Sequence, residues 1–198
     1  VFINRAEVLI MMEQYQSAAQ DLISALSVGK NNKEAIESLA AMSDVQYDAV
    51  IGALNNSIEK APRNGLFYYI AAQIAMDHNH FADAEYYLNA INANKLYEYH
   101  SIYNDLAKSQ YCLGKYTEAL SNIDIAIRAC DNEPDYFITR SKIQRALGNN
   151  AEALKATKMA LMQNADHVPS LIEQARVYIA QNNNNEALSA LNIAISNN

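Results

Sequence analysis

The chain has 198 residues, of which 51% are apolar, and its formal net charge is −7. This apolar content is enough to bury a continuous core, so a disordered chain is not expected. The acidic balance argues against nucleic acid as a partner, because phosphate binding needs clustered lysines and arginines.

Helix-forming residues dominate the sequence, which contains only five glycines and three prolines. We therefore expect an all-α fold without strands, built from pairs of antiparallel helices. The apolar periodicity predicts twelve helices. The first helices of the pairs are expected near residues 2–12, 34–43, 67–78, 99–113, 134–147 and 168–181, and the second near 15–28, 47–60, 81–93, 116–129, 150–163 and 184–197.

No apolar run approaches the roughly 18 residues of a membrane span, and the first residues do not resemble a secretory signal. We expect a soluble protein without direct membrane insertion. Cytoplasmic and periplasmic locations both stay open, because the sequence begins with Val1 and a targeting segment could have preceded it.

A repeat of about 34 residues runs through the whole chain. It is marked by a small or apolar residue early in each second helix, at Ala18, Val50, Ala84, Ala119, Ala153 and Ala187. A second small residue follows seven places later in most copies, as at Ala25, Ser57, Ala126, Ala160 and Ala194. This spacing places both residues on one face of an amphipathic helix.

The interval between the first two markers is 32 residues, which implies a deletion of two residues. Aligning Ile36, Leu39 and Ala40 with the first helix of the fourth unit places this deletion in the turn near Asp44. The register of the helices is expected to survive it.

The pattern resembles the tetratricopeptide repeat (TPR) family over the full length of the chain. The fourth unit matches best, at Tyr103, Leu106, Ala107, Gly114, Tyr116, Ala119, Ile123 and Ala126. The sequence departs from the family pattern in the second and sixth units, where Ile36 and Leu171 replace the signature aromatic residue of the first helix. The resemblance implies a single array that forms an α-α superhelix, or solenoid, of about six helical hairpins, with repeats near residues 1–32, 33–64, 65–99, 100–133, 134–167 and 168–198.

Both ends of the array lack the polar caps that repeat proteins need, so we expect a fragment of a longer chain. The resemblance implies a scaffold that binds a protein or peptide in a concave groove. The sequence shows no paired carboxylates, Gly-rich phosphate loop or hydrolase motif, so we expect no cofactor, metal ion or enzymatic activity. Two alternatives stay open: a structural protein that self-associates through its C-terminal helix into a homo-oligomer, and the targeting arm of a larger protein.

Three groups of residues could carry chemistry, and each has a simpler explanation. His78 and His80 lie near Asp77 and Asp83 but do not complete a four-ligand metal set, so we interpret them as polar turn residues. A nucleophilic set of Cys112, His78 and Asp77 lacks an oxyanion hole. The tyrosines at residues 68–69, 86–87 and 97–99 could stack on bases or anchor a partner, but basic residues are sparse there and most of these tyrosines occur at core positions of helices. Cys112 and Cys130 are expected at opposite ends of a hairpin and therefore unbonded.

One stripe of the first helices is the candidate binding surface. Lys108, Lys142 and Arg176 are spaced by 34 residues and would stack as a cationic ladder. Asp105 and Glu173 lie three residues before Lys108 and Arg176, close enough for local ion pairs of little energetic value. A solvated surface is therefore the competing interpretation. If the ladder binds, its ligand is an acidic peptide or a chain terminus. In the resembled family the full stripe lines the concave surface, and here it comprises Asn104, Lys108, Tyr111, Ile138, Lys142, Arg145, Ile172, Arg176 and Ile179.

Overall fold

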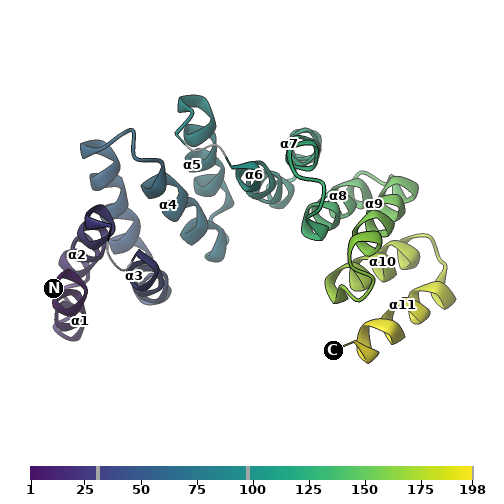
Figure 1. Cartoon of the computed structure of the whole chain (residues 1–198), viewed down its shortest axis with the longest axis horizontal. Coiled ribbons are helices and arrows are strands. Elements are labelled where there is room, and N and C mark those ends of the chain that lie inside the picture. Colours follow the sequence, from purple (N-terminus) through teal and green to yellow (C-terminus); the bar gives the residue numbers. More distant parts are fainter. Residues whose placement is uncertain (30–31, 97–98, 198) are drawn as a thin grey trace. The chain divides into compact units, whose positions relative to one another are not determined.

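The computed structural model describes residues 1–29, 32–96 and 99–197, apart from the side chain of Asn32, and every element within them is a helix. Contacts divide the chain into two compact units, Val1–Glu98 and Tyr99–Asn198. In each unit consecutive helices pack against one another (Figure 1). The first unit contains α1 (Phe2–Met11), α2 (Tyr15–Val28), α3 (Asn32–Lys60), α4 (Gly65–Asp77) and α5 (Phe81–Asn94). The second contains α6 (His100–Cys112), α7 (Tyr116–Ala129), α8 (Pro134–Ala146), α9 (Asn150–Gln163), α10 (Val168–Ala180) and α11 (Asn184–Ser196).

The all-α prediction is confirmed, and the helix limits agree with the expected ones to within two residues except in α3. There the expected helices at 34–43 and 47–60 run together as one element, which contains a kink at Gln46. The eleven helical elements of the described residues therefore include both expected helices of the second hairpin, as the two halves of α3.

The two-residue deletion explains why these two helices follow each other so closely. Within the other hairpins the helices are separated by three residues, and the middle one has a positive φ, as at Gly114 (75°) and Gly148 (80°). The shortened second hairpin turns without a three-residue connection: only Gln46 departs from helical geometry there, with φ −140° and ψ 59°.

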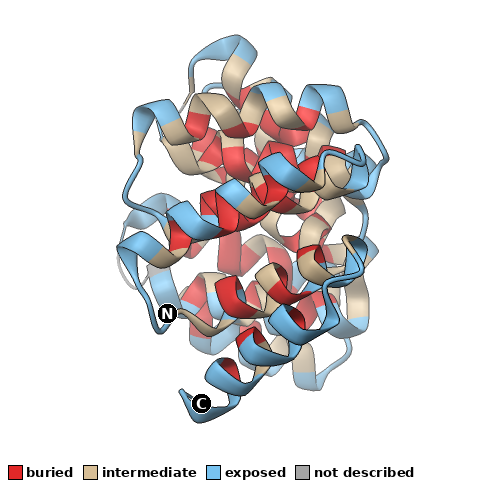
Figure 2. Cartoon of the chain, turned by 90° about the vertical axis from the view of Figure 1, so that its right-hand side faces the viewer, coloured by how far each residue is buried: buried red, intermediate tan, exposed pale blue. Residues whose placement is uncertain are grey.

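The repeat markers form the core of the hairpins. Small residues at these positions let neighbouring helices approach closely. Exposure is at most 3% at every marker: Ala18, Val50, Ala84, Ala119, Ala153 and Ala187. Figure 2 shows the buried residues on the helix faces that meet other helices, with the exposed residues on the outer faces.

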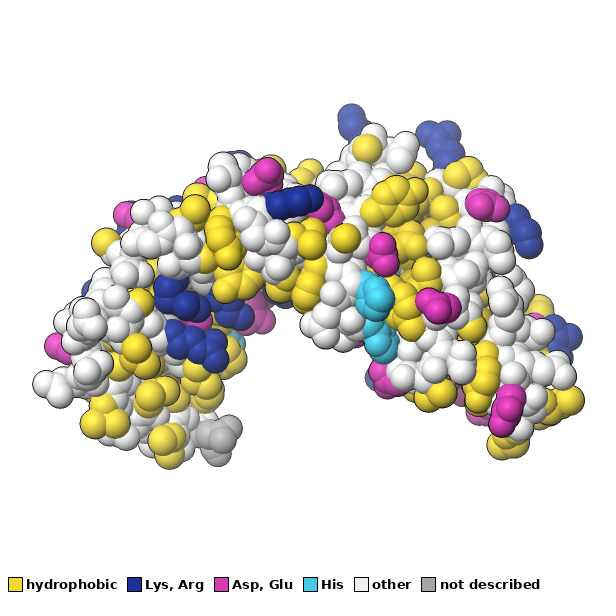
Figure 3. Space-filling view, turned by 180° about the vertical axis from the view of Figure 1, so that it is seen from behind, with side chains coloured by type: hydrophobic (Ala, Val, Ile, Leu, Met, Phe, Trp, Pro, Cys, Tyr) yellow, Lys and Arg dark blue, Asp and Glu magenta, His cyan; other side chains and the backbone are white. Residues whose placement is uncertain are grey.

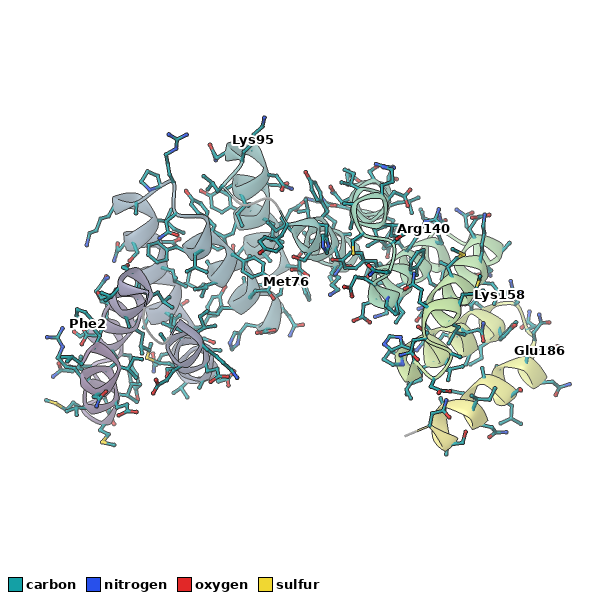
Figure 4. All side chains as sticks on the ribbon, in the orientation of Figure 1. Phe2, Met76, Lys95, Arg140, Lys158 and Glu186 are labelled. Atoms are coloured by element: carbon teal, nitrogen blue, oxygen red, sulfur yellow. The ribbon has the colours of Figure 1, made fainter. Side chains whose placement is uncertain are left out.

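Each second helix also packs against the first helix of the next hairpin in the C-terminal unit, α7 against α8 and α9 against α10. Leu120 and Ile127 of α7 contact the buried cluster that includes Tyr136 and Ile143 of α8. Arg140 of α8 (Figure 4) pairs with Asp124 of α7, and its Nε atom lies 2.9 Å from a carboxylate oxygen of Asp124. Apolar packing and an ion pair thus join successive hairpins.

Candidate binding surface on α6, α8 and α10

The three first helices of the C-terminal unit form one layer. Helix α8 contacts α6 and α10 directly, in addition to its contacts with α7 and α9. Helices α8 and α10 begin with a proline in the first or second position, where a missing backbone N–H costs nothing. All nine residues of the candidate stripe lie on these three helices.

Two members of the stripe are buried between helices. Asn104 of α6 is 4% exposed, and its Oδ1 accepts a hydrogen bond of 3.0 Å from the Thr139 hydroxyl of α8. Ile138 is 5% exposed. These two side chains therefore stabilise the layer and offer little area to a ligand.

The cationic members of the stripe reach solvent to different degrees, and we call Lys108, Lys142, Arg145 and Arg176 the cationic surface. The side chains of Lys108, Arg145 and Arg176 are 44%, 29% and 55% exposed. Lys142 is half-buried. Figure 3 shows lysine and arginine side chains gathered on one face of the C-terminal unit, with acidic side chains between them.

One carboxylate connects two of these cations. Glu173 of α10 is only 1% exposed. Its two oxygens accept hydrogen bonds from Arg145 Nε of α8 at 3.0 Å and from Arg176 Nη1 at 3.4 Å. The expected local pair of Glu173 with Arg176 is present. The carboxylate is buried, however, and also bridges to a neighbouring helix.

The other two cations differ in their partners. Lys108 Nζ lies 3.6 Å from an oxygen of Asp105, as expected from their spacing. Lys142 forms no ion pair with any residue in the described ranges. Its charge acts on Cys112 of α6: burial raises the pKa of that thiol, and Lys142 offsets part of the rise. Lys142 is therefore the cation most available to an added anion.

Apolar side chains flank the cations. The Tyr111 ring lies 5.7 Å from the ring of Tyr116, measured between centroids, and remains half-buried. Ile179 is 54% exposed. Ile172 does not join the cationic surface. It lines a cavity of about 170 Å³ between α10 and α11, together with Leu191 and Ile195.

The histidines of the N-terminal unit are engaged by ordinary contacts. His78 Nε2 lies 2.9 Å from the Ser43 hydroxyl and 3.6 Å from an Asp44 oxygen. The His80 ring stacks on Tyr47 with centroids 4.3 Å apart. Within the described ranges no three His, Cys, Asp or Glu side chains come close enough to hold a metal ion.

The remaining candidates have structural surroundings. Cys112 and Cys130 are free thiols. Tyr68 and Tyr87 are buried in the N-terminal unit, as expected of core positions, whereas Tyr86 and Tyr99 are 68% and 58% exposed. Tyr97 lies outside the described residues.

The fold is that of TPR proteins. MamA matches with a TM-score of 0.69 and 14% sequence identity, over 82% of this chain and 89% of MamA. YrrB, a TPR protein described as having an unusual peptide-binding site, matches with a TM-score of 0.63 and 15% identity over 99% of this chain and 84% of its own. TTC0263, a thermophilic TPR protein of Thermus thermophilus, matches with a TM-score of 0.64 and 19% identity, over 77% of this chain and 83% of its own.

No family model and no curated protein sequence matches the chain. The likeness to MamA, YrrB and TTC0263, at 14–19% sequence identity, is a likeness of fold. Among the described residues, no helix has the length and apolarity that crossing a membrane requires.

Proposed function

We propose that the protein is an interaction scaffold whose cationic surface binds an acidic peptide segment or an acidic chain terminus. The TPR fold generally serves protein–protein interaction, and the finer assignment rests on the arrangement of charge. Four cations share this layer with two buried carboxylates, Asp105 and Glu173, in a chain whose net charge is −7. A positive surface in an acidic molecule attracts an anionic partner and repels a basic one.

Lys142 is the observation that carries the proposal. It occupies the helix between those of Lys108 and Arg176 and has no carboxylate partner in the described ranges. Lys142 is half-buried as a residue, and a cation close to a packed surface gains more from an added carboxylate than a fully exposed one, because its pairing is less screened by water. The ligand therefore places a carboxylate near Lys142, with apolar contacts to Tyr111 and Ile179.

The test is a fluorescence-anisotropy titration with a labelled peptide of alternating Glu and Leu, and the same peptide with Gln for Glu as the neutral control. Lys142→Glu is expected to weaken binding of the acidic peptide by about tenfold, since it replaces an attraction by a repulsion. The matched control is Lys158→Glu, an equal change of charge at an exposed residue of α9 (Figure 4).

Equal affinities of the two variants for the acidic peptide would contradict the proposal. So would equal affinities of the unaltered protein for the acidic and neutral peptides. Binding should also weaken as salt is raised, because the contact is electrostatic and partly exposed.

A second candidate function, assembly through α11, is favoured by the apolar side chains that this helix exposes. Leu188 and Ile195 are 60% and 76% exposed. The residues at the same repeat positions in α7, Leu120 and Ile127, are half-buried and pack on the cluster that includes Tyr136 of the following helix. The α11 face is thus shaped for a helix of another hairpin, which a second copy of the chain could supply.

Sedimentation velocity over a range of protein concentrations tests the assembly. A sedimentation coefficient that rises with concentration, and that Ile195→Glu returns to the monomer value, would support it. A monomer at all concentrations would exclude it.

A further inference from the structure

The cationic surface contains a buried carboxylate, that of Glu173. A site that needed only positive charge would bind an anion more strongly without it. Glu173 is 1% exposed and removes one unit of positive charge from the surface that we propose to bind an acidic ligand. A carboxylate taken out of water is costly unless cations and hydrogen bonds compensate it. Arg145 and Arg176 provide that compensation.

The contacts of Glu173 restrict two arginines while leaving them able to bind. Arg145 donates to Glu173 through Nε, and Arg176 donates through Nη1. Each guanidinium has five N–H donors in a rigid plane, so most of its donors are left for another acceptor. One carboxylate thereby orients guanidinium groups from two neighbouring helices, α8 and α10.

We propose that Glu173 is a positioning residue of the binding surface, an inference that rests on the proposed function. It holds Arg145 and Arg176 in one arrangement, in which their outer N–H groups face the carboxylate of the acidic ligand. Binding then pays a smaller entropy cost for ordering two long side chains. Recognition depends on the geometry of the two guanidinium groups and not on the net charge alone.

This proposal and simple charge attraction predict opposite signs for the same substitution. Glu173→Gln makes the surface more positive by one unit, so attraction alone predicts tighter binding of the acidic peptide. If Glu173 positions the arginines, the same change releases them and binding weakens. Asp105→Asn is the comparison variant, because it makes the same change of charge at a carboxylate that lies 3.6 Å from Lys108 and contacts neither Arg145 nor Arg176 in the ion pairs of the described residues.

The experiment is the same anisotropy titration with the alternating Glu and Leu peptide. We expect Glu173→Gln to weaken binding by about fivefold, on the scale of a lost charge-assisted contact, and Asp105→Asn to tighten it by about twofold. Glu173→Asp, which keeps the charge but withdraws the carboxylate by one methylene, should weaken binding as well. Circular dichroism melting checks that each variant is folded at the assay temperature. If Glu173→Gln is unfolded at that temperature, the binding of Glu173→Asp provides the test instead.

A second measurement separates this inference from the proposed function. The Nε–Hε signal of Arg145 in a nitrogen-edited NMR spectrum should be protected from exchange in the unaltered protein and lose protection in Glu173→Gln. Peptide binding by the unaltered protein together with equal or tighter binding by the folded Glu173→Gln variant would overturn the positioning role alone. No peptide binding by the unaltered protein would overturn the proposed function, and protection of the Arg145 signal would then still report whether Glu173 holds that side chain.

Discussion

The Nε atom of Arg145 on α8 lies 3.0 Å from a carboxylate oxygen of Glu173 on α10. One hairpin earlier, the Thr139 hydroxyl of α8 donates to Asn104 of α6 at 3.0 Å. Successive first helices of the C-terminal unit are therefore joined by polar contacts whose members are buried or half-buried. These contacts fix the layer on which the cationic surface lies.

The Arg145–Glu173 pair should contribute measurably to stability. A double-mutant cycle with Arg145→Ala and Glu173→Ala is expected to give a coupling of about 1–2 kcal/mol, because the acceptor is buried and the hydrogen bond is charge-assisted. Urea unfolding monitored by circular dichroism measures it. The control cycle uses the exposed pair Lys33 and Glu37, 3.7 Å apart, for which about 0.3 kcal/mol is expected. Additive effects at positions 145 and 173 would contradict the expectation.

The left-handed turn position of the hairpins should tolerate only some residues. Gly148 has φ 80°, and an added Cβ would meet no atom within 4 Å, so Gly148→Ala isolates the backbone strain. It should lower the free energy of unfolding by about 1 kcal/mol. Gly148→Asn should cost less, because asparagine tolerates this conformation and occupies the same position at Asn79 and Asn182, both at φ 60°. Equal losses for the two variants, measured by urea unfolding, would contradict this account.

Tyr47 should make stability fall in alkaline solution. Burial, followed by the negative charge of Asp83, raises the pKa of Tyr47 from 10.0 to about 12. Above pH 10 the unfolded chain loses this proton while the folded protein keeps it, so unfolding becomes easier between about pH 10 and 12. Below pH 10 both states are protonated and the residue contributes no pH dependence.

Tyr47→Phe tests this expectation. The variant should lose part of the alkaline decline in unfolding free energy. It should cost little at neutral pH, because the buried hydroxyl forms no hydrogen bond of good geometry in the described ranges and Asp83 is the charged side chain that acts on it most strongly. Denaturant unfolding at a series of pH values measures both effects. An unchanged alkaline slope would show that Tyr47 is not the source.

The repeat itself could be predicted because its signal is redundant. Six markers from Ala18 to Ala187 share one spacing and one chemical requirement, a small or apolar side chain at a helix contact, and all are buried. The form of the shortened turn in α3 could not be predicted in the same way. The deletion was visible near Asp44, but the sequence does not show that a single non-helical residue, Gln46, makes the turn.

The burial of individual stripe residues also escaped prediction. Asn104 and Glu173 are polar, and their sequence neighbours suggest a solvated surface, yet both are buried by contacts with α8. For Glu173, the repeat spacing could have indicated burial. One repeat position, 34 residues apart in successive units, holds Asp105, Thr139 and Glu173. The structure buries this position in all three units, with exposures of at most 8%.

The central claim is that an acidic peptide binds on the face formed by α6, α8 and α10. It is tested most directly by mapping backbone amide shifts in NMR spectra as the alternating Glu and Leu peptide is added. The account predicts shifts concentrated around Lys108, Lys142 and Arg176, which shrink as salt is raised. Shifts confined to α7, α9 and α11, or no shifts at any peptide concentration, would contradict it.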